Sequence, residues 1–139
     1  MREITLPAAC ENIEKAVDFV NGQLEAIHCP PKIMAQIDVA IDELFGNIAL
    51  YAYDEGSGQA TIRVEVTQES SVIITFVDSG VPYNPLQKPD PDVTEALEDR
   101  QIGGLGIFMV KKSMDDIAYE YKNGQNILRI KKYMESKNG

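Results

Sequence analysis

Apolar residues recur at helical spacing in two neighbouring stretches near the N-terminus. The first runs from Ile13 to Ile27, and its spacing of three or four residues predicts an amphipathic helix. Pro30-Pro31 ends this helix and opens the next, because proline is tolerated in the first turn of a helix. The second helix is predicted to run to about Tyr53. The two stripes consist of Ile13, Val17, Val20, Leu24 and Ile27, and of Ile33, Ile37, Ala40, Ile41, Leu44, Ile48 and Tyr51.

Other stretches show the two-residue alternation of β-strands. Val72, Ile74 and Phe76 share one face with Asp78, because strand side chains repeat every two residues. Asn123-Gly124 supplies a hairpin turn of the kind that needs positive φ. Both amphipathic helices need a surface to cover, and a sheet provides it. The predicted strands are residues 2–7, 60–67, 71–78, about 117–121 and about 125–133.

Residues 80–101 interrupt this compact pattern. They hold four of the seven prolines and five acidic residues, and a loop of this length inside a compact domain is usually a functional lid or disordered. Asp92-Val93-Thr94-Glu95 resembles a capping box, which predicts a short helix over roughly 93–99. A solvated insertion without a role is the alternative.

Composition and charge narrow the class of protein. The chain has 139 residues, the length of one domain, and its 13 basic against 22 acidic residues give a net charge of −9. This balance disfavours nucleic acid and anionic membranes as partners, because phosphate groups must be met by positive charge. No apolar run reaches the ~18–20 residues of a membrane span, and the first residues lack a signal-peptide pattern, so we expect a cytoplasmic protein.

The candidate metal and nucleophile residues are few. Cys10 and Cys29 are too few and too scattered for a disulfide framework or a zinc site, and they suit a reducing compartment. His28 is the single histidine, which excludes a His-rich metal centre. A Ser-His-Asp triad based on that one residue has no further support in the sequence.

The first motif with candidate chemistry is Glu43-Leu44-Phe45-Gly46-Asn47 on the second predicted helix. A spacing of four places the side chains of Glu43 and Asn47 on one face, one turn apart, at the margin of the apolar stripe. The carboxylate can act as a general base, and the amide oxygen can bind Mg²⁺, which prefers oxygen ligands. Taken alone, the pair also fits an ordinary Glu and Asn at the core boundary.

The second motif is Asp78-Ser79-Gly80-Val81-Pro82 at the end of a predicted strand. Asp78 shares the core face of that strand, and a buried carboxylate needs a partner, for which the exocyclic amine N6 of adenine is suitable. Gly80 allows the backbone to come close to a flat base. The alternative is a strand-ending turn with an Asx-type hydrogen bond.

The third motif is Gly103-Gly104-Leu105-Gly106, where a loop is predicted to become a helix. Helix N-termini expose unpaired N–H groups and a positive dipole end, so a glycine-rich entry can hold phosphate. Lys111 and Lys112 complement the negative end of this helix. The motif lacks the Gly-Lys-Ser/Thr of a P-loop and the leading strand of a Rossmann fingerprint, and the alternative is a flexible hinge. Together, the three motifs point to a nucleotide.

In these motifs and in the order of its elements, the chain resembles the GHKL ATPase superfamily, which includes gyrase, heat-shock chaperone ATPases, histidine kinases and mismatch-repair proteins. Within it the chain is most similar to the small anti-sigma-factor serine kinases of bacteria. Glu43–Asn47, continuing to Tyr53, resembles the N box; Asp78-Ser79-Gly80 resembles the first glycine box, and Gly103–Gly106 the second. The resemblance covers roughly residues 5–133.

The resemblance implies a fold. This is the Bergerat fold of class α+β, a two-layer α/β sandwich with a mixed, mostly antiparallel sheet and helices on one face. We therefore expect a single ATPase domain over residues 1–134, an ATP lid over about 84–101, and a frayed tail at 135–139.

The resemblance also implies roles for individual residues. Asn47 would hold Mg²⁺, Glu43 would deprotonate the attacking hydroxyl, Asp78 would accept a hydrogen bond from adenine N6, and Gly80 would pack beside the base. The phosphates of ATP or ADP would lie against the second glycine box and be reached by an arginine, a set consisting of Gly103, Gly104, Leu105, Gly106 and Arg100.

Two positions depart from the family pattern. Pro82 stands where the first glycine box usually has its second glycine, a substitution familiar in the anti-sigma branch. A threonine that often helps to fix the adenine in the last strand is replaced, and Asn126 lies near that place.

The implied activity is that of a protein serine/threonine kinase. Its substrate would be a serine on a small anti-anti-sigma (STAS-type) protein, and a homodimer would bind a sigma factor as a second partner, without direct contact to nucleic acid or membrane. The alternative is a nucleotide-binding module that switches partners without transferring phosphate.

Overall fold

The computed structural model describes residues 1–53, 58–87 and 104–134. All strands and helices that the hydrophobic pattern predicts within these ranges are present, and the second helix ends two residues earlier than predicted. The elements are β1 (Arg2–Pro7), α1 (Ile13–Ala26), α2 (Pro31–Tyr51), β2 (Gln59–Val66), β3 (Ser71–Asp78), α3 (Gly104–Ser113), β4 (Asp116–Lys122) and β5 (Gln125–Tyr133), with short 3-10 turns at Cys10–Asn12 and Pro85–Gln87.

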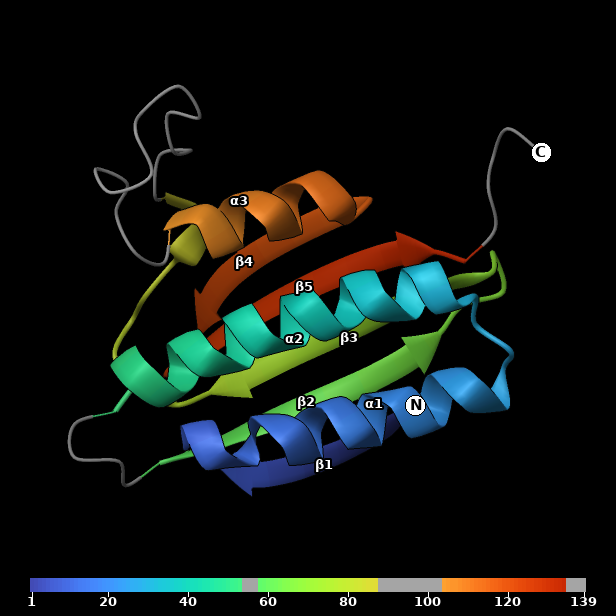
Figure 1. Ribbon diagram of the computed structural model, residues 1–139. Coiled ribbons are helices and arrows are strands. Elements are labelled where there is room, and N and C mark those ends of the chain that lie inside the picture. The colour runs from blue at the N-terminus through green and yellow to red at the C-terminus, as the bar shows by residue number, and fades with distance from the viewer. Residues whose placement is uncertain (54–57, 88–103, 135–139) are drawn as a thin grey trace.

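The strands form one five-stranded sheet in the order β1-β2-β3-β5-β4. All four pairings among the described strands are antiparallel. Figure 1 shows α1, α2 and α3 side by side on one face of this sheet, with α1 over β1 and β2 and α3 over β4. The expected two-layer α+β architecture is thereby confirmed. Asn123 and Gly124 have φ values of 55° and 77°, as the predicted hairpin turn between β4 and β5 requires.

The core lies between the helices and the sheet. Strands β1, β2, β3 and β5 contribute their even-numbered side chains, β4 contributes the odd-numbered Ile117 and Tyr119, and the helices contribute the predicted stripes. Two details of the second stripe differ from the prediction. Phe45 is fully buried although it lies off the stripe, and Tyr51 is 51% exposed. The reason is position along α2. This helix packs against α1, α3 and β3, and Phe45 lies within it, whereas Tyr51 is the last helical residue and has its ring centroid 5.8 Å from that of Tyr83.

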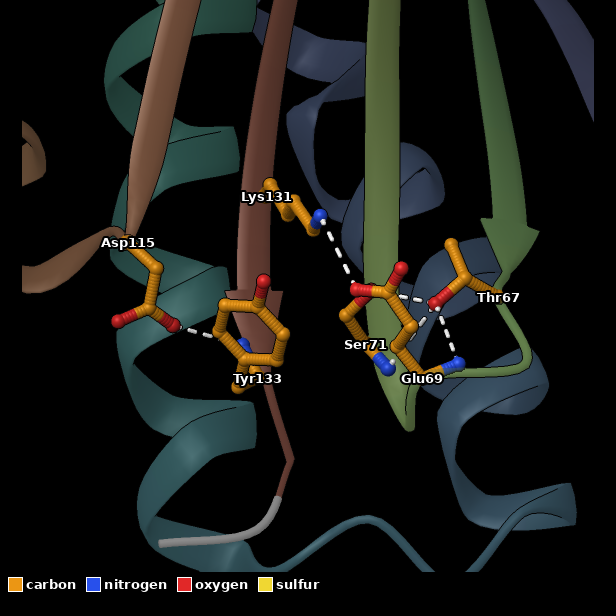
Figure 2. Close-up of polar contacts among 6 residues, drawn as sticks. All are labelled: Thr67, Glu69, Ser71, Asp115, Lys131 and Tyr133. Atoms are coloured by element: carbon orange, nitrogen blue, oxygen red, sulfur yellow. Dashed lines mark hydrogen bonds and ion pairs between the residues drawn. The ribbon is translucent and has the colours of Figure 1, made fainter. Parts of the chain in front are cut away.

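A polar turn connects β2 and β3 at one end of the sheet (Figure 2). The hydroxyl oxygen of Thr67 lies 2.6 Å from that of Ser71 and accepts a hydrogen bond from the Glu69 backbone at 3.2 Å. On the neighbouring strand, the Lys131 ammonium lies 3.9 Å from the Glu69 carboxylate and over the ring of Tyr133. Because Ser71 begins β3 and Asp78 ends it, this turn fixes the end of the sheet that is remote from the Asp78 motif.

A polar contact also ties the C-terminal end of α3 to the sheet. Lys132 on β5 donates to the carbonyl oxygen of Ser113 at 2.6 Å, and its ammonium lies 4.0 Å from the Asp115 carboxylate. A cation at this place stabilises the negative end of the helix dipole, and Lys111 and Lys112 in the last turn add to this stabilisation.

Both cysteines have free thiols, with Cys10 exposed and Cys29 buried, in agreement with the predicted lack of a disulfide framework.

Asp38 is a half-buried carboxylate on α2, and its removal should stabilise the fold at neutral pH. Burial raises its pKa, a hydrogen bond with Asn21 lowers it, and the charge of Asp18 raises it further. Because the pKa of this carboxyl is higher in the folded than in the unfolded chain, the group stabilises the fold at a pH below the ordinary Asp pKa of about 3.9. This stabilisation is lost as the pH rises through the pKa of the folded state. Asp38→Asn should therefore raise the midpoint of thermal unfolding at pH 7 by a few degrees, and the difference should vanish in acid.

Thermal unfolding followed by circular dichroism between pH 3 and 8 measures this difference. Asp42→Asn is the matched control, because Asp42 lies on the same helix with an exposed side chain. A variant that is no more stable than the wild type at pH 7 would contradict the prediction.

Several sequence predictions lie outside the described residues. They are the capping box and helix at 93–99, residues 88–101 of the predicted lid, the tail at 135–139, and the candidate phosphate ligands Arg100 and Gly103. Of the helices within the described ranges, none has the length and apolar character that crossing a membrane requires.

Candidate functional site

Helix α2 runs through the centre of the site and contacts both glycine motifs. Glu43, Asn47 and Ala52 follow one another along it over about 14 Å, at 1.5 Å of rise per residue. Glu43 lies against the start of α3, Asn47 lines a pocket, and Ala52 lies against the turn after β3. The three motifs, which are separated by 20 residues or more in the sequence, therefore meet on one helix.

The pocket lies between α2, the ends of β3, β4 and β5, and the loop that follows β3. It has about 400 Å³ of empty space, its open mouth included. Its walls are mostly apolar, and a few polar side chains converge on it. The lining residues are Leu44, Asn47, Ile48, Ala52, Phe76, Asp78, Tyr83, Pro85, Tyr119, Asn126 and Leu128.

Asp78 is 5% exposed and lies on the helix-facing side of β3, as predicted. Its Oδ1 atom accepts hydrogen bonds from the Gly80 backbone and from the Asn126 side chain, both at 2.9 Å. The first of these is the Asx-type bond that the sequence left open as an alternative. The structure shows that the turn and the pocket are compatible, because the same carboxylate ends the strand and lines the cavity.

Gly80 is required by a neighbour in the protein itself. A Cβ atom at this position would lie 2.1 Å from the carbonyl oxygen of Ala52, closer than any real contact. The next residue, Val81, donates its backbone N–H to the same oxygen at 2.8 Å. The close approach of the C-terminal end of α2 is therefore a reason for this glycine in addition to the predicted close approach of a base.

Asn126 connects the walls of the pocket. Its side-chain nitrogen donates to Asp78 Oδ1 and to the Val81 carbonyl, both at 2.9 Å, and its oxygen accepts from the Tyr83 backbone at 3.1 Å and from the Tyr119 hydroxyl. Burial raises the pKa of Tyr119, the Tyr83 backbone lowers it, and the negative charge of Asp78 raises it. The Tyr119 hydroxyl is therefore protonated at neutral pH and acts as a donor.

The second glycine box begins α3, as predicted. The helix starts at Gly104, and at Gly106 a Cβ atom would lie 2.1 Å from Oε2 and 2.8 Å from Oε1 of Glu43. Gly106 therefore provides the room in which the Glu43 carboxylate lies. This contact places the candidate base beside the candidate phosphate cradle.

Asn47 has the properties of a ligand-binding residue. It is 9% exposed, it lines the pocket, and its side-chain nitrogen is buried without a hydrogen-bond partner. Buried polar groups in proteins are nearly always paired, so an exception calls for an explanation such as a ligand. Within the described ranges, no group of three or more His, Cys, Asp or Glu side chains is arranged to hold a metal ion.

The sequence predicted part of this site. The structure brings together Glu43, Asn47, Asp78, Gly80 and Gly106, and Gly104 and Leu105 begin the helix beside them. Sequence reasoning missed Tyr83 and Tyr119 and noted Asn126 without assigning it. The alternation of Ile117, Tyr119 and Tyr121 contained a usable signal, because a tyrosine on a core-facing position needs a partner for its hydroxyl.

The comparisons with known proteins agree with this geometry. The model of the histidine kinase-like ATPase domain matches residues 6–132, so the chain belongs to the histidine kinase-like ATPase family. Within that family the chain is similar to bacterial serine-protein kinases. It is 32% identical over 133 residues to the serine-protein kinase RsbW of Bacillus mycoides, and 33% identical over 133 residues to that of Bacillus cereus. Each of these alignments covers 93% of this chain and 82% of the relative.

Two further matches are partial or distant. The chain is 28% identical over 95 residues to the serine/threonine-protein kinase BtrW of Bordetella bronchiseptica, covering 68% of this chain and 66% of that protein. Among solved structures, a Mycobacterium tuberculosis protein with RsbU and RsbW domains superposes with a TM-score of 0.65 at 12% identity. That superposition covers 96% of this chain and 33% of the other, and at this identity it supports the fold alone.

Proposed function

We propose that this protein is an ATP-dependent protein serine/threonine kinase that switches between two protein partners. The observation that supports this most directly is the path of α2, which places a carboxylate at the start of α3 and a buried, incompletely paired amide in the pocket. The similarity to serine-protein kinases over 93% of the chain supports the same reaction. The proposal includes the cytoplasm as its location, because both ATP and the proposed partners occur there.

In this proposal the base of ATP enters the pocket and the phosphates extend toward α3. Asp78 accepts the hydrogen bond of adenine N6, and Gly80 lies beside the base. The phosphates lie against Gly103, Gly104, Leu105 and Gly106, where backbone N–H groups at the start of a helix favour anions, and Arg100 reaches the terminal phosphate. Residues 84–101 form the lid, of which Pro85 is a described pocket wall.

The residues present fit a magnesium ion bound together with ATP. Mg²⁺ in phosphoryl-transfer sites is held by one or two protein oxygens, by phosphate oxygens and by water, so a single amide such as Asn47 is sufficient. When bound, the ion neutralises negative charge on the phosphates. Asn47 would supply its side-chain oxygen to the ion, and its unpaired nitrogen would donate to a phosphate oxygen.

The chemical step transfers the γ-phosphoryl group to a serine hydroxyl. The serine oxygen forms a bond to the γ-phosphorus while the bond from that phosphorus to the bridging oxygen of ADP breaks. Glu43 accepts the hydroxyl proton, and ADP leaves. Positioning and electrostatic stabilisation supply most of the catalysis in such reactions, which explains why few side chains are needed.

We propose that the serine belongs to a small anti-anti-sigma protein of the STAS type, and that a homodimer of this chain binds a sigma factor when that protein is absent. The test is transfer of label from [γ-³²P]ATP with Mg²⁺ to a purified STAS-type protein, with a serine-to-alanine substrate as control. Labelled phosphoserine is the expected result. ATP binding without label on any candidate substrate would instead support a nucleotide-binding partner switch without phosphotransfer.

Gly106→Ala should disturb this reaction without unfolding the protein. The new Cβ meets the far end of a flexible side chain, so the Glu43 carboxylate moves and the backbone stays. Displacement of a catalytic group by about 1 Å can cost roughly 100-fold in rate, and we expect a loss of up to that size. Alanine favours the helix over glycine, so the thermal midpoint should not fall.

The measurement is the transfer rate together with thermal unfolding. Gly22→Ala is the matched control, because Gly22 lies in α1 with nothing within 4 Å of its would-be Cβ. Normal transfer by the Gly106 variant would show that the position of Glu43 is unimportant.

A further inference from the structure

Asn126 is the residue at which several parts of the pocket wall meet. It is 5% exposed and lies near the start of β5, directly opposite Asp78 in the register of β3 and β5. Its hydrogen bonds reach the carboxylate of Asp78, the loop at Val81 and Tyr83, and the Tyr119 hydroxyl on β4. One side chain thereby joins two strands and the loop that bounds the pocket.

These four hydrogen bonds use the full capacity of the side chain. A carboxamide has two N–H donors and an oxygen with two lone pairs, and all of them are engaged within the protein. Asn126 therefore lines the pocket without a group left for a ligand. This differs from the threonine that the family resemblance leads one to expect near this place, which helps to fix the adenine.

The capacity of the Asp78 carboxylate to accept hydrogen bonds is only partly used. Its Oδ1 atom accepts two hydrogen bonds, one from the Gly80 backbone and one from Asn126. A carboxylate has about four acceptor positions over its two oxygens, so Asp78 retains capacity for a ligand. The bond to Asn126 limits the rotation of the carboxylate, and it fixes the direction in which the remaining capacity points.

We propose that Asn126 is a positioning residue that sets the base selectivity of the pocket by holding Asp78, without touching the base itself. This inference rests on the proposed function, because it takes the ligand to be ATP. A fixed acceptor matches the 6-amino group of adenine and opposes the 6-oxo group of hypoxanthine. A carboxylate that is free to turn can accept instead from the N1–H group of hypoxanthine, so release of Asp78 should erase the difference.

The test is titration calorimetry of the full chain with ATP and with inosine triphosphate, for the wild type and for Asn126→Leu. Leucine has a similar size and forms no hydrogen bonds. ATP affinity should fall roughly 10- to 100-fold, the range for a lost hydrogen bond to a charged group, while inosine triphosphate affinity should change less than about threefold. Tyr119→Phe is the milder variant, because it removes one of the four hydrogen bonds of Asn126. It should lower the ratio of ATP affinity to inosine triphosphate affinity by about threefold.

The ratio of the two affinities separates positioning from a structural role. A merely structural role would weaken both nucleotides equally, and that result would overturn the inference. An unchanged preference for ATP in a folded Asn126 variant and in Tyr119→Phe would also overturn it, and would leave the proposed function intact. Failure of the wild type to bind either nucleotide would overturn the proposed function and this inference together.

Discussion

Glu43→Gln is expected to lower the rate of phosphoryl transfer by about 10²- to 10⁴-fold, the usual contribution of a general base. Glutamine keeps the size of the side chain and its place beside Gly106 and cannot accept a proton. Glu43 is not a wall of the pocket that lies around Asp78, so ATP affinity should stay within about twofold of the wild type. The measurement is transfer of label to the STAS-type protein under single-turnover conditions, with ATP affinity from calorimetry.

Glu25→Gln serves as the control, because Glu25 lies on α1 with an exposed side chain. Transfer at the wild-type rate by Glu43→Gln would exclude the base role. If the rate and the ATP affinity fell together, Glu43 would be a nucleotide-binding residue instead.

Asn47→Ala should remove most of the benefit that Mg²⁺ gives to ATP binding. In the wild type, ATP should bind more tightly with Mg²⁺ than with EDTA, because the buried Asn47 is proposed to offer an oxygen to the ion. Loss of a residue that supports a metal typically costs about 10- to 100-fold in affinity, and we expect a decrease in this range for Mg-ATP. Binding of ATP in EDTA should change much less.

Asn12→Ala provides a matched control for the loss of a buried asparagine. Asn12 is 6% exposed and donates to the Pro7 carbonyl at 2.9 Å, and it is not among the residues that line the pocket. Its removal should lower stability and leave the effect of Mg²⁺ unchanged. Equal affinity of the wild type with Mg²⁺ and with EDTA would show that the ion takes no part in binding.

The individual helices and strands were predictable because the hydrophobic pattern determines their periods, whereas the two-layer architecture was expected from the resemblance to the GHKL superfamily. The stripe that includes Ile37 and Ile41 and the alternation of Val72, Ile74 and Phe76 define helix and strand periods that no other element satisfies. The pattern missed Phe45 and misplaced Tyr51. Their burial depends on which neighbours cover a given turn of α2, and periodicity contains no information about neighbours.

The site was predictable where the local helix or strand period alone places a side chain. The spacing of Glu43 and Asn47 and the core-facing position of Asp78 follow from helix and strand periods. The contacts of Gly80 with Ala52 and of Gly106 with Glu43 link residues that are distant in the sequence. Asn126 meets Asp78 through the register of β3 and β5, which a single sequence does not specify for strands that are far apart.

The register of β5 has a consequence for the order of events during synthesis. This strand follows the other described strands in the chain, yet it lies between β3 and β4 and places Asn126 beside Asp78. A nascent chain that has not yet released residues 125–133 from the ribosome contains Glu43, Asn47 and Asp78 and still lacks a complete pocket. Nucleotide can therefore bind only after β5 has joined the sheet. Its binding energy then stabilises the whole domain, and not one loop alone, against unfolding and proteolysis.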